Sequence, residues 1–79
     1  MENLETMREI IDRLYSEECD TFIQIPDGVT PADVHKYITH RGGKYQGSEY
    51  WDDEVLYHYN NGFMMRVNTW NLKITVWRD

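Results

Sequence analysis

The sequence lacks several features, and each absence excludes a class of protein. It has one cysteine, so no intramolecular disulfide can form, and export to an oxidising compartment is not indicated. Its first residues are acidic where a signal peptide needs positive charge. No stretch approaches the roughly 20 apolar residues of a membrane-spanning helix, and there are no repeats or low-complexity tracts. We therefore expect a cytoplasmic protein without a membrane segment.

Motifs for catalysis and metal binding are also missing. The nucleophile elbow G-x-S-x-G, the P-loop and the dinucleotide fingerprint are all absent. His35 and His40 are five residues apart, on different flanks of a predicted helix, and no second ligand pair accompanies them. Cys19 lies among the carboxylates of residues 17–20, which disfavour a reactive thiolate. We therefore expect no enzyme, no metal site and no cofactor.

Acidic charge is concentrated at one end of the chain. Residues 1–20 carry seven carboxylates and two arginines, while the remaining residues carry seven acids and six bases. The formal net charge of the whole chain is −6. Such an asymmetry bears on solubility and on the choice of a basic partner, and it disfavours direct binding to nucleic acid.

Aromatic residues are abundant for so short a chain, with three Trp, six Tyr and two Phe. Each brings about 150–250 Å² of surface that folding can bury. This content compensates for the small size and favours a packed globule over a disordered acidic tail. We expect a single domain over residues 1–79.

Apolar spacing predicts a first helix from Leu4 to Cys19, with Asn3 as its N-cap. One face of this helix is apolar and the opposite face is acidic. A second helix begins after Thr30, with Pro31 at its first position and Asp33 completing a capping box.

Two glycines, Gly42 and Gly43, end the second helix by allowing a left-handed cap. Residues 21–25 are β-rich and precede a turn at 26–28. Residues 44–51 predict a less regular strand with a bulge or bend at Gly47, and the chain turns back at Asp52-Asp53.

The last third of the chain alternates between apolar and polar residues, as in a β-meander. A loop at 60–62 with Gly62 at positive φ predicts the pairs Tyr59–Phe63, Tyr57–Met65 and Val55–Val67. A turn near 68–71 then predicts the pairs Val67–Leu72, Met65–Ile74 and Phe63–Val76. The expected fold is an α+β two-layer sandwich, with two helices on one face of a three- or four-stranded antiparallel sheet.

Two acidic groups are candidate contacts for a partner. Glu5, Glu9 and Asp12 stand about one helical turn apart, roughly 5–6 Å, which is in the range of neighbouring phosphates. The cluster of Glu49 with Asp52, Asp53 and Glu54 extends this surface if the fold brings the two groups together. The alternative is that the acidic helix face only keeps the protein soluble.

Tryptophans are the candidate anchors, because buried Trp dominates binding hot spots. They are Trp51, Trp70 and Trp77. Together with the acidic groups, they suggest a small non-enzymatic protein that occupies a basic surface of a protein partner, such as a nucleic-acid-handling enzyme. The nearest analogy in size and charge is the compact nucleic-acid mimics that phages and mobile elements use as anti-defence inhibitors.

Two other functions stay open at this stage. Arg66, Lys73 and Trp77 are expected on the sheet face away from the helices, where they suit a single-stranded nucleic-acid-binding module. The same aromatic face suits a homodimeric accessory subunit. Either reading requires that face to be exposed.

Overall fold

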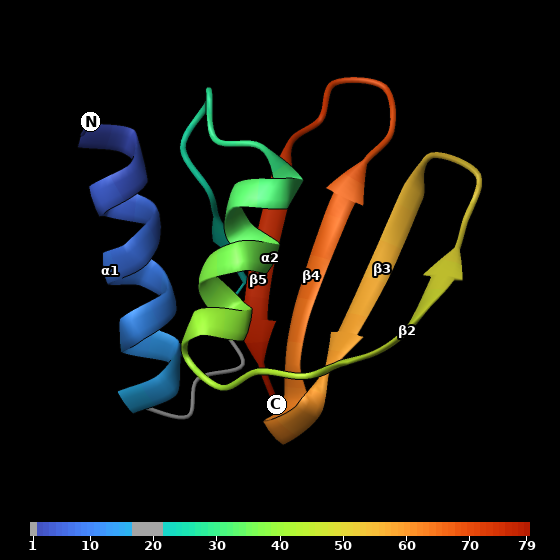
Figure 1. The fold of residues 1–79 in the computed structure, drawn as a ribbon. Helices are drawn as coiled ribbons and strands as arrows, with labels where there is room; N and C mark the ends of the chain where they lie inside the picture. Colours follow the sequence, from blue (N-terminus) through green and yellow to red (C-terminus); the bar gives the residue numbers. More distant parts are fainter. Residues whose placement is uncertain (1, 17–21) are drawn as a thin grey trace.

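The structure is a two-layer α+β sandwich, in which two helices lie on one face of a five-stranded antiparallel sheet (Figure 1). The computed structural model describes residues 2–16 and 22–79. The elements in chain order are α1 (Glu2–Ser16), β1 (Ile23–Gln24), α2 (Pro31–His40), β2 (Tyr45–Tyr50), β3 (Glu54–Tyr59), β4 (Phe63–Asn68) and β5 (Ile74–Arg78), with a 3-10 turn over Asn60–Gly62.

Helix α1 forms because apolar residues recur at three- and four-residue spacing, and Met7, Ile11 and Leu14 are buried. The predicted N-cap was wrong. Asn3 lies inside the helix, and its side-chain Nδ2 donates a 2.7 Å hydrogen bond to the backbone carbonyl oxygen of Asp27. The predicted C-terminal end at Cys19 lies outside the described residues.

Helix α2 follows its predicted start closely. The Thr30 hydroxyl accepts from the Asp33 amide, and the Asp33 carboxylate accepts from the Thr30 amide, both at 3.1 Å. This reciprocal capping box satisfies two donors that the first helical turn leaves free. Gly42, at a φ of +92°, follows the helix as predicted.

The sheet has five strands in the order β1-β5-β4-β3-β2, rather than the three or four predicted. The added strand is β1, two residues long, which pairs antiparallel with β5 through Ile23↔Val76 and Gln24↔Thr75. Strand β2 forms the opposite edge and carries the predicted irregularity between Tyr45 and Gly47.

The β3–β4 register is the predicted one, with Val55↔Val67 and Tyr57↔Met65. The chain reverses through Asn61 and Gly62, both at positive φ (61° and 76°). Their left-handed conformations let a three-residue loop match the twist of the strands.

The predicted β4–β5 register was wrong by two residues: the observed pairs are Val67↔Ile74, Met65↔Val76 and Phe63↔Arg78. The side-chain carbonyl oxygen of Asn68 accepts hydrogen bonds from the backbone amides of Trp70 and Asn71. These bonds form a turn between the end of β4 and the start of β5. Leu72 therefore falls in the loop, at a φ of 59°, and is 61% exposed. Because the register differs by an even number of residues, the other side chains of the strand stay on the faces predicted for them.

One apolar cluster joins both helices to the sheet, and its sheet residues come from β3, β4 and β5. Its members are Met7, Ile11, Leu14, Ile25, Val29, Val34, Ile38, Tyr59, Phe63, Met65, Val67, Ile74 and Val76. Figure 1 shows α2 over β5 and α1 beside α2, with β4, β3 and β2 extending beyond the helices. The inner face of the sheet is therefore only partly covered.

Candidate functional site

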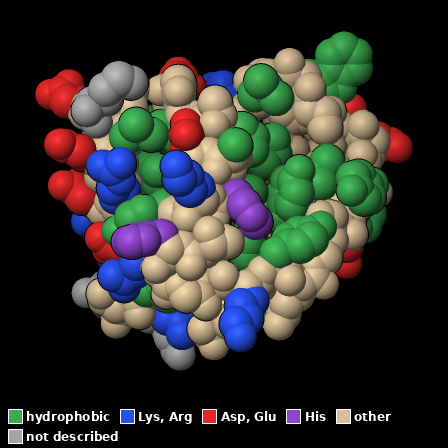
Figure 2. All heavy atoms as spheres, viewed as in Figure 1, with side chains coloured by type: hydrophobic (Ala, Val, Ile, Leu, Met, Phe, Trp, Pro, Cys, Tyr) green, Lys and Arg blue, Asp and Glu red, His purple; other side chains and the backbone are tan. Residues whose placement is uncertain are grey.

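The first acidic group lies along the exposed side of α1. Glu2, Glu5 and Glu9 are exposed, and acidic side chains form a row along the flank of the molecule where α1 lies (Figure 2). Within the part of the chain that the structure describes, no hydrogen bond or ion pair engages the carboxylates of Glu5 and Glu9.

Asp12 differs from the other acids of this helix, because it ties α1 to α2. Its Oδ1 accepts a 2.8 Å hydrogen bond from the Tyr37 hydroxyl and lies 3.4 Å from the Arg41 guanidinium. The same hydrogen bond to Asp12 raises the pKa of Tyr37, because ionising the phenol would remove its donor. Of the three acids predicted on this helix, Glu5 and Glu9 stay open to a partner, and Asp12 is neutralised internally.

The second acidic group shares one end of the sheet with exposed aromatic side chains. The Trp70 indole Nε1 donates a 3.0 Å hydrogen bond to Asp53 Oδ1, and the Thr69 amide donates to the Asp53 carbonyl oxygen at 2.8 Å. These bonds join the β4–β5 loop to the β2–β3 turn. We call this end of the molecule the aromatic–acidic corner; it comprises Tyr50, Trp51, Asp52, Asp53, Glu54 and Trp70.

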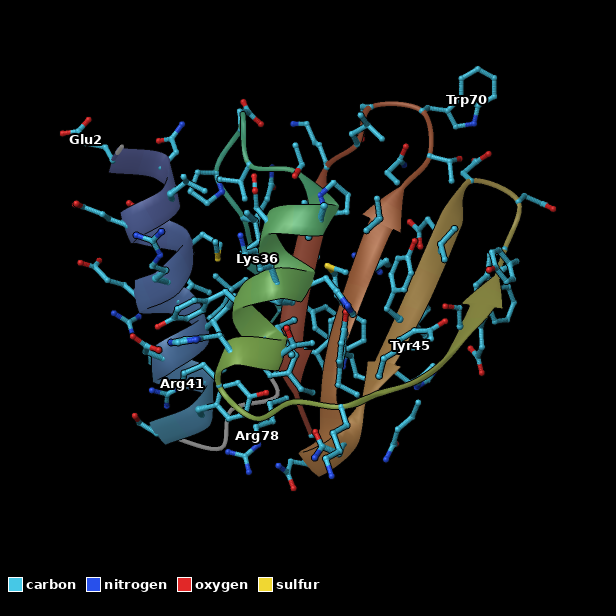
Figure 3. The ribbon with its side chains drawn as sticks, viewed as in Figure 1. Glu2, Lys36, Arg41, Tyr45, Trp70 and Arg78 are labelled. Carbon is cyan, nitrogen blue, oxygen red and sulfur yellow. The ribbon has the colours of Figure 1, made fainter. Side chains whose placement is uncertain are left out.

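Aromatic exposure at the corner is high. Tyr50 is 80% exposed, Trp51 66% and Trp70 83%. Figure 3 shows Trp70 extending from the end of its loop, away from the body of the protein. Large apolar side chains gathered on the surface of a small protein mark an interaction site more often than isolated ones do. Five of the nine predicted contact residues meet here: Trp51, Asp52, Asp53, Glu54 and Trp70.

The two acidic groups do not form one surface. Helix α1 packs against β5, whereas the corner lies beyond β3 and β2 (Figure 1). Strands β5 and β2 are three spacings apart, about 14 Å, which exceeds the Debye length of about 8 Å at physiological salt. Arg8 of α1 and Lys36 of α2 line a hollow between the two helices, and basic side chains are visible on this face of the molecule (Figure 2). The two acidic groups are therefore separate surfaces.

Trp77 is not exposed with the other tryptophans. Trp77 is 8% exposed, and its ring packs against that of Phe22, with centroids 4.6 Å apart. The Arg66 guanidinium lies 5.7 Å from the Phe22 ring centre and 6.0 Å from that of Trp77, and it pairs with Glu54 at 3.7 Å. Base stacking on Trp77 therefore has no free ring to use, because the outer face is covered at this position.

Sequence patterning missed a pocket on the inner face of the sheet, beside α2. It has a volume of about 380 Å³ and is lined by Pro31, Ala32, His35, Tyr45, Tyr57, Tyr59 and Met65. The helices were expected to cover the whole apolar face. A signal was present, because the inner residues are aliphatic, Met or Phe towards β4 but mostly tyrosine towards β2, and tyrosine suits a boundary between core and water.

The walls of the pocket are largely aromatic. Burial, assisted by the neighbouring Tyr57 and Tyr45, raises the pKa of Tyr59 well above its ordinary value of 10.0. The Tyr59 hydroxyl therefore keeps its proton at neutral pH and lies 2.6 Å from Nδ1 of His35. The Tyr45 ring stands edge-on to both His35 and Tyr59. Such walls suit an apolar or aromatic side chain.

Metal ligands do not gather in the described part of the chain. Nowhere in it do three or more His, Cys, Asp or Glu side chains come together in a way that could hold an ion. His35 bonds to Tyr59, and His58 lies 3.7 Å from Glu49, too far for a hydrogen bond. Cys19 lies outside the described residues.

No known protein family, curated protein or solved structure matches this chain. Among residues 2–16 and 22–79, no helix combines the length and apolar character that crossing a bilayer requires. Any functional conclusion therefore rests on the acidic row of α1, the aromatic–acidic corner and the tyrosine-lined pocket.

Proposed function

We propose that this protein is a small acidic binding protein, without enzymatic activity, that occupies a basic surface of a protein partner. The observation that carries the proposal is the aromatic–acidic corner. It combines exposed tryptophans with carboxylates, and a hydrogen bond from Trp70 to Asp53 joins its two loops, the β4–β5 loop and the β2–β3 turn.

This combination suits a basic protein surface for a physical reason. Lysine and arginine side chains interact with carboxylates and also with the faces of Trp and Tyr, at about 0.5–2 kcal/mol for each cation–π contact. Trp and Tyr also supply most of the binding energy at many interfaces. The hydrogen bond from Trp70 to Asp53 restrains the indole, so less side-chain entropy is lost on binding.

The row on α1 has a different part in this proposal. Glu2, Glu5 and Glu9 extend the negative field of a chain whose net charge is −6. A field of this kind speeds the approach of a basic partner and fixes its orientation more than it adds affinity.

Proteins that handle nucleic acids present large basic surfaces, so we propose one of them as the partner. An anti-defence inhibitor of the phage or mobile-element type, acting in the cytoplasm as a nucleic-acid mimic, fits the size and charge of the chain. This part of the proposal rests on analogy, and Trp51 and Trp70 are its candidate anchors, with Asp52, Asp53 and Glu54 around them.

A capture experiment tests the proposal. The immobilised protein is incubated with lysate of its source cell over a series of salt concentrations, and bound proteins are identified by mass spectrometry. Asp52→Lys is compared with Asp27→Lys, which changes the net charge equally but lies outside the corner. We expect Asp52→Lys to reduce capture of a basic protein at least ten-fold and Asp27→Lys to change it less than two-fold. Equal losses, or retention of nucleic acid in place of protein, would overturn the proposal.

A further inference from the structure

The β2 strand leaves one edge of the sheet open. It is the last strand in the order β1-β5-β4-β3-β2 and pairs with β3 alone among the described strands. The Trp51 amide donates to the Glu54 carbonyl oxygen at 2.8 Å, so the backbone of Trp51 faces β3. Backbone groups alternate in direction along an antiparallel strand. The N–H and C=O groups of Ser48 and Tyr50 therefore point towards the open edge.

Side chains on the two faces of this edge differ in chemistry. Ser48 pairs with Tyr57 and Tyr50 with Val55, so both lie on the inner face, towards the tyrosine-lined pocket. Figure 2 shows hydrophobic side chains gathered over this part of the sheet. Glu49, which pairs with Leu56, lies on the outer face, and its side chain is 53% exposed.

From this arrangement we propose that the β2 edge binds an extended segment of a basic partner as a sixth, antiparallel strand. The segment alternates apolar and basic residues. Its apolar side chains pack beside the pocket on the inner face, and a lysine or arginine lies next to Glu49 on the outer face. The inference rests on the proposed function and adds how the partner is held, because backbone hydrogen bonds supply affinity and alternate side chains supply specificity in such strand addition.

A second copy of this chain fits the same edge less well. Pairing two β2 strands through the free groups of Ser48 and Tyr50 brings Glu49 of one copy opposite Glu49 of the other. Like charges directly opposite each other destabilise a sheet, and each copy carries a net charge of −6. A basic segment would instead place a positive charge next to Glu49 and would be attracted to the negatively charged protein.

The bulge near Gly47 sets the size of the footprint. The β2–β3 register shifts between Tyr45 and Gly47, where Gly47 has a φ of +130°. Bulges twist an edge and limit the length over which another strand can pair. The segment bound by Ser48 and Tyr50 is therefore short, about three to five residues at a rise of about 3.4 Å each.

Synthetic peptides test this inference with defined material. The probe is a capped hexapeptide of alternating lysine and valine, titrated into the ¹⁵N-labelled full chain and followed by NMR. In the proposed antiparallel arrangement, valine N–H groups face β2 and lysine N–H groups face solvent. We expect N-methylation of the valines to weaken binding at least ten-fold and N-methylation of the lysines to change it less than two-fold. The amides of Ser48 and Tyr50 shift most on binding.

Controls separate strand addition from simple charge attraction. A peptide of the same composition with its lysines in one block carries equal charge but cannot alternate, and it binds at least ten-fold more weakly. Glu49→Lys weakens binding of the alternating peptide at least five-fold, while Asp27→Lys changes it less than two-fold. Equal effects of the two N-methylation patterns, or larger shifts along α1 than at β2, would overturn the inference.

The outcomes also distinguish this inference from the proposed function. If Asp52→Lys abolishes partner capture while both N-methylated peptides bind alike, the partner binds at the corner without strand addition. A dimer mass in light scattering that Tyr50→Pro, which removes an edge-facing N–H, reduces to 9.5 kDa would show that a second copy occupies the edge and would overturn the basic segment as its occupant.

Discussion

Trp70 and Asp53, seventeen residues apart in the chain, are joined by a hydrogen bond from the indole Nε1 to a carboxylate oxygen at 3.0 Å. Both had been predicted as partner contacts on separate grounds, one as an aromatic anchor and one as a steering charge. Their bond makes them one structural unit at the end of the sheet. It also orients a side chain that is 83% exposed.

A double-mutant cycle measures this bond. Trp70→Phe and Asp53→Ala each remove it, and we expect a coupling free energy of about 0.5–1 kcal/mol from urea unfolding of the two single variants and the double variant. The value is small because solvent reaches both groups. Strictly additive effects would show that the indole is not held by the carboxylate.

Stability is expected to fall as the pH rises above about 10. The folded state keeps the proton on Tyr59, whose pKa burial raises, whereas the unfolded chain releases it near 10.0. The unfolded state then binds fewer protons than the folded state, so the free energy of unfolding decreases with increasing pH.

Tyr59→Phe should flatten this alkaline loss in urea unfolding measured between pH 8 and pH 11. The exposed Tyr50→Phe is its control and should leave the slope unchanged. An identical slope in the wild type and Tyr59→Phe would contradict the assignment. Tyr15 contributes in the same direction, since burial raises its pKa despite the nearby Arg78 and Arg41.

Asp12 and Glu9 are expected to differ in stability although both are acids of α1. Asp12→Ala removes the Tyr37 hydroxyl bond and the Arg41 contact, at a cost of about 1–2 kcal/mol. Glu9→Ala removes an exposed charge that makes no ion pair within residues 2–16 and 22–79, and it should change stability by less than about 0.5 kcal/mol. Urea unfolding of both variants checks this, and a cost for Glu9→Ala as large as that for Asp12→Ala would contradict it.

Replacing Leu72 should stabilise the protein. Leu72 has a φ of 59° and is 61% exposed, so it bears left-handed strain without burying its side chain. Leu72→Asn relieves that strain, because Asn tolerates the left-handed region, and should add about 0.5–1 kcal/mol. Leu72→Ala keeps a poorly tolerated residue and serves as the control. Thermal unfolding of both variants is the measurement, and a lower midpoint for Leu72→Asn would refute this account of the loop.

The sequence alone was sufficient where the deciding interactions are local. Thr30 and Asp33 cap α2 from three residues apart, and the loop at Asn60–Gly62 sets the β3–β4 register through its own backbone angles. The class of fold follows from two amphipathic helices and an alternating C-terminal third. The same local reasoning failed at Leu72, because the Asn68 side chain offers a turn that apolar alternation does not reveal.

The tertiary structure alone decided which predicted site residues reach the surface. Phe22 packs over Trp77, and Asp12 accepts a hydrogen bond from Tyr37 of α2. The sheet separates the two acidic groups. Periodicity tells which side of a strand is apolar, but not how far along that side the helices extend. That extent depends on packing between distant segments, which here leaves the tyrosine-lined pocket and the edge of β2 uncovered.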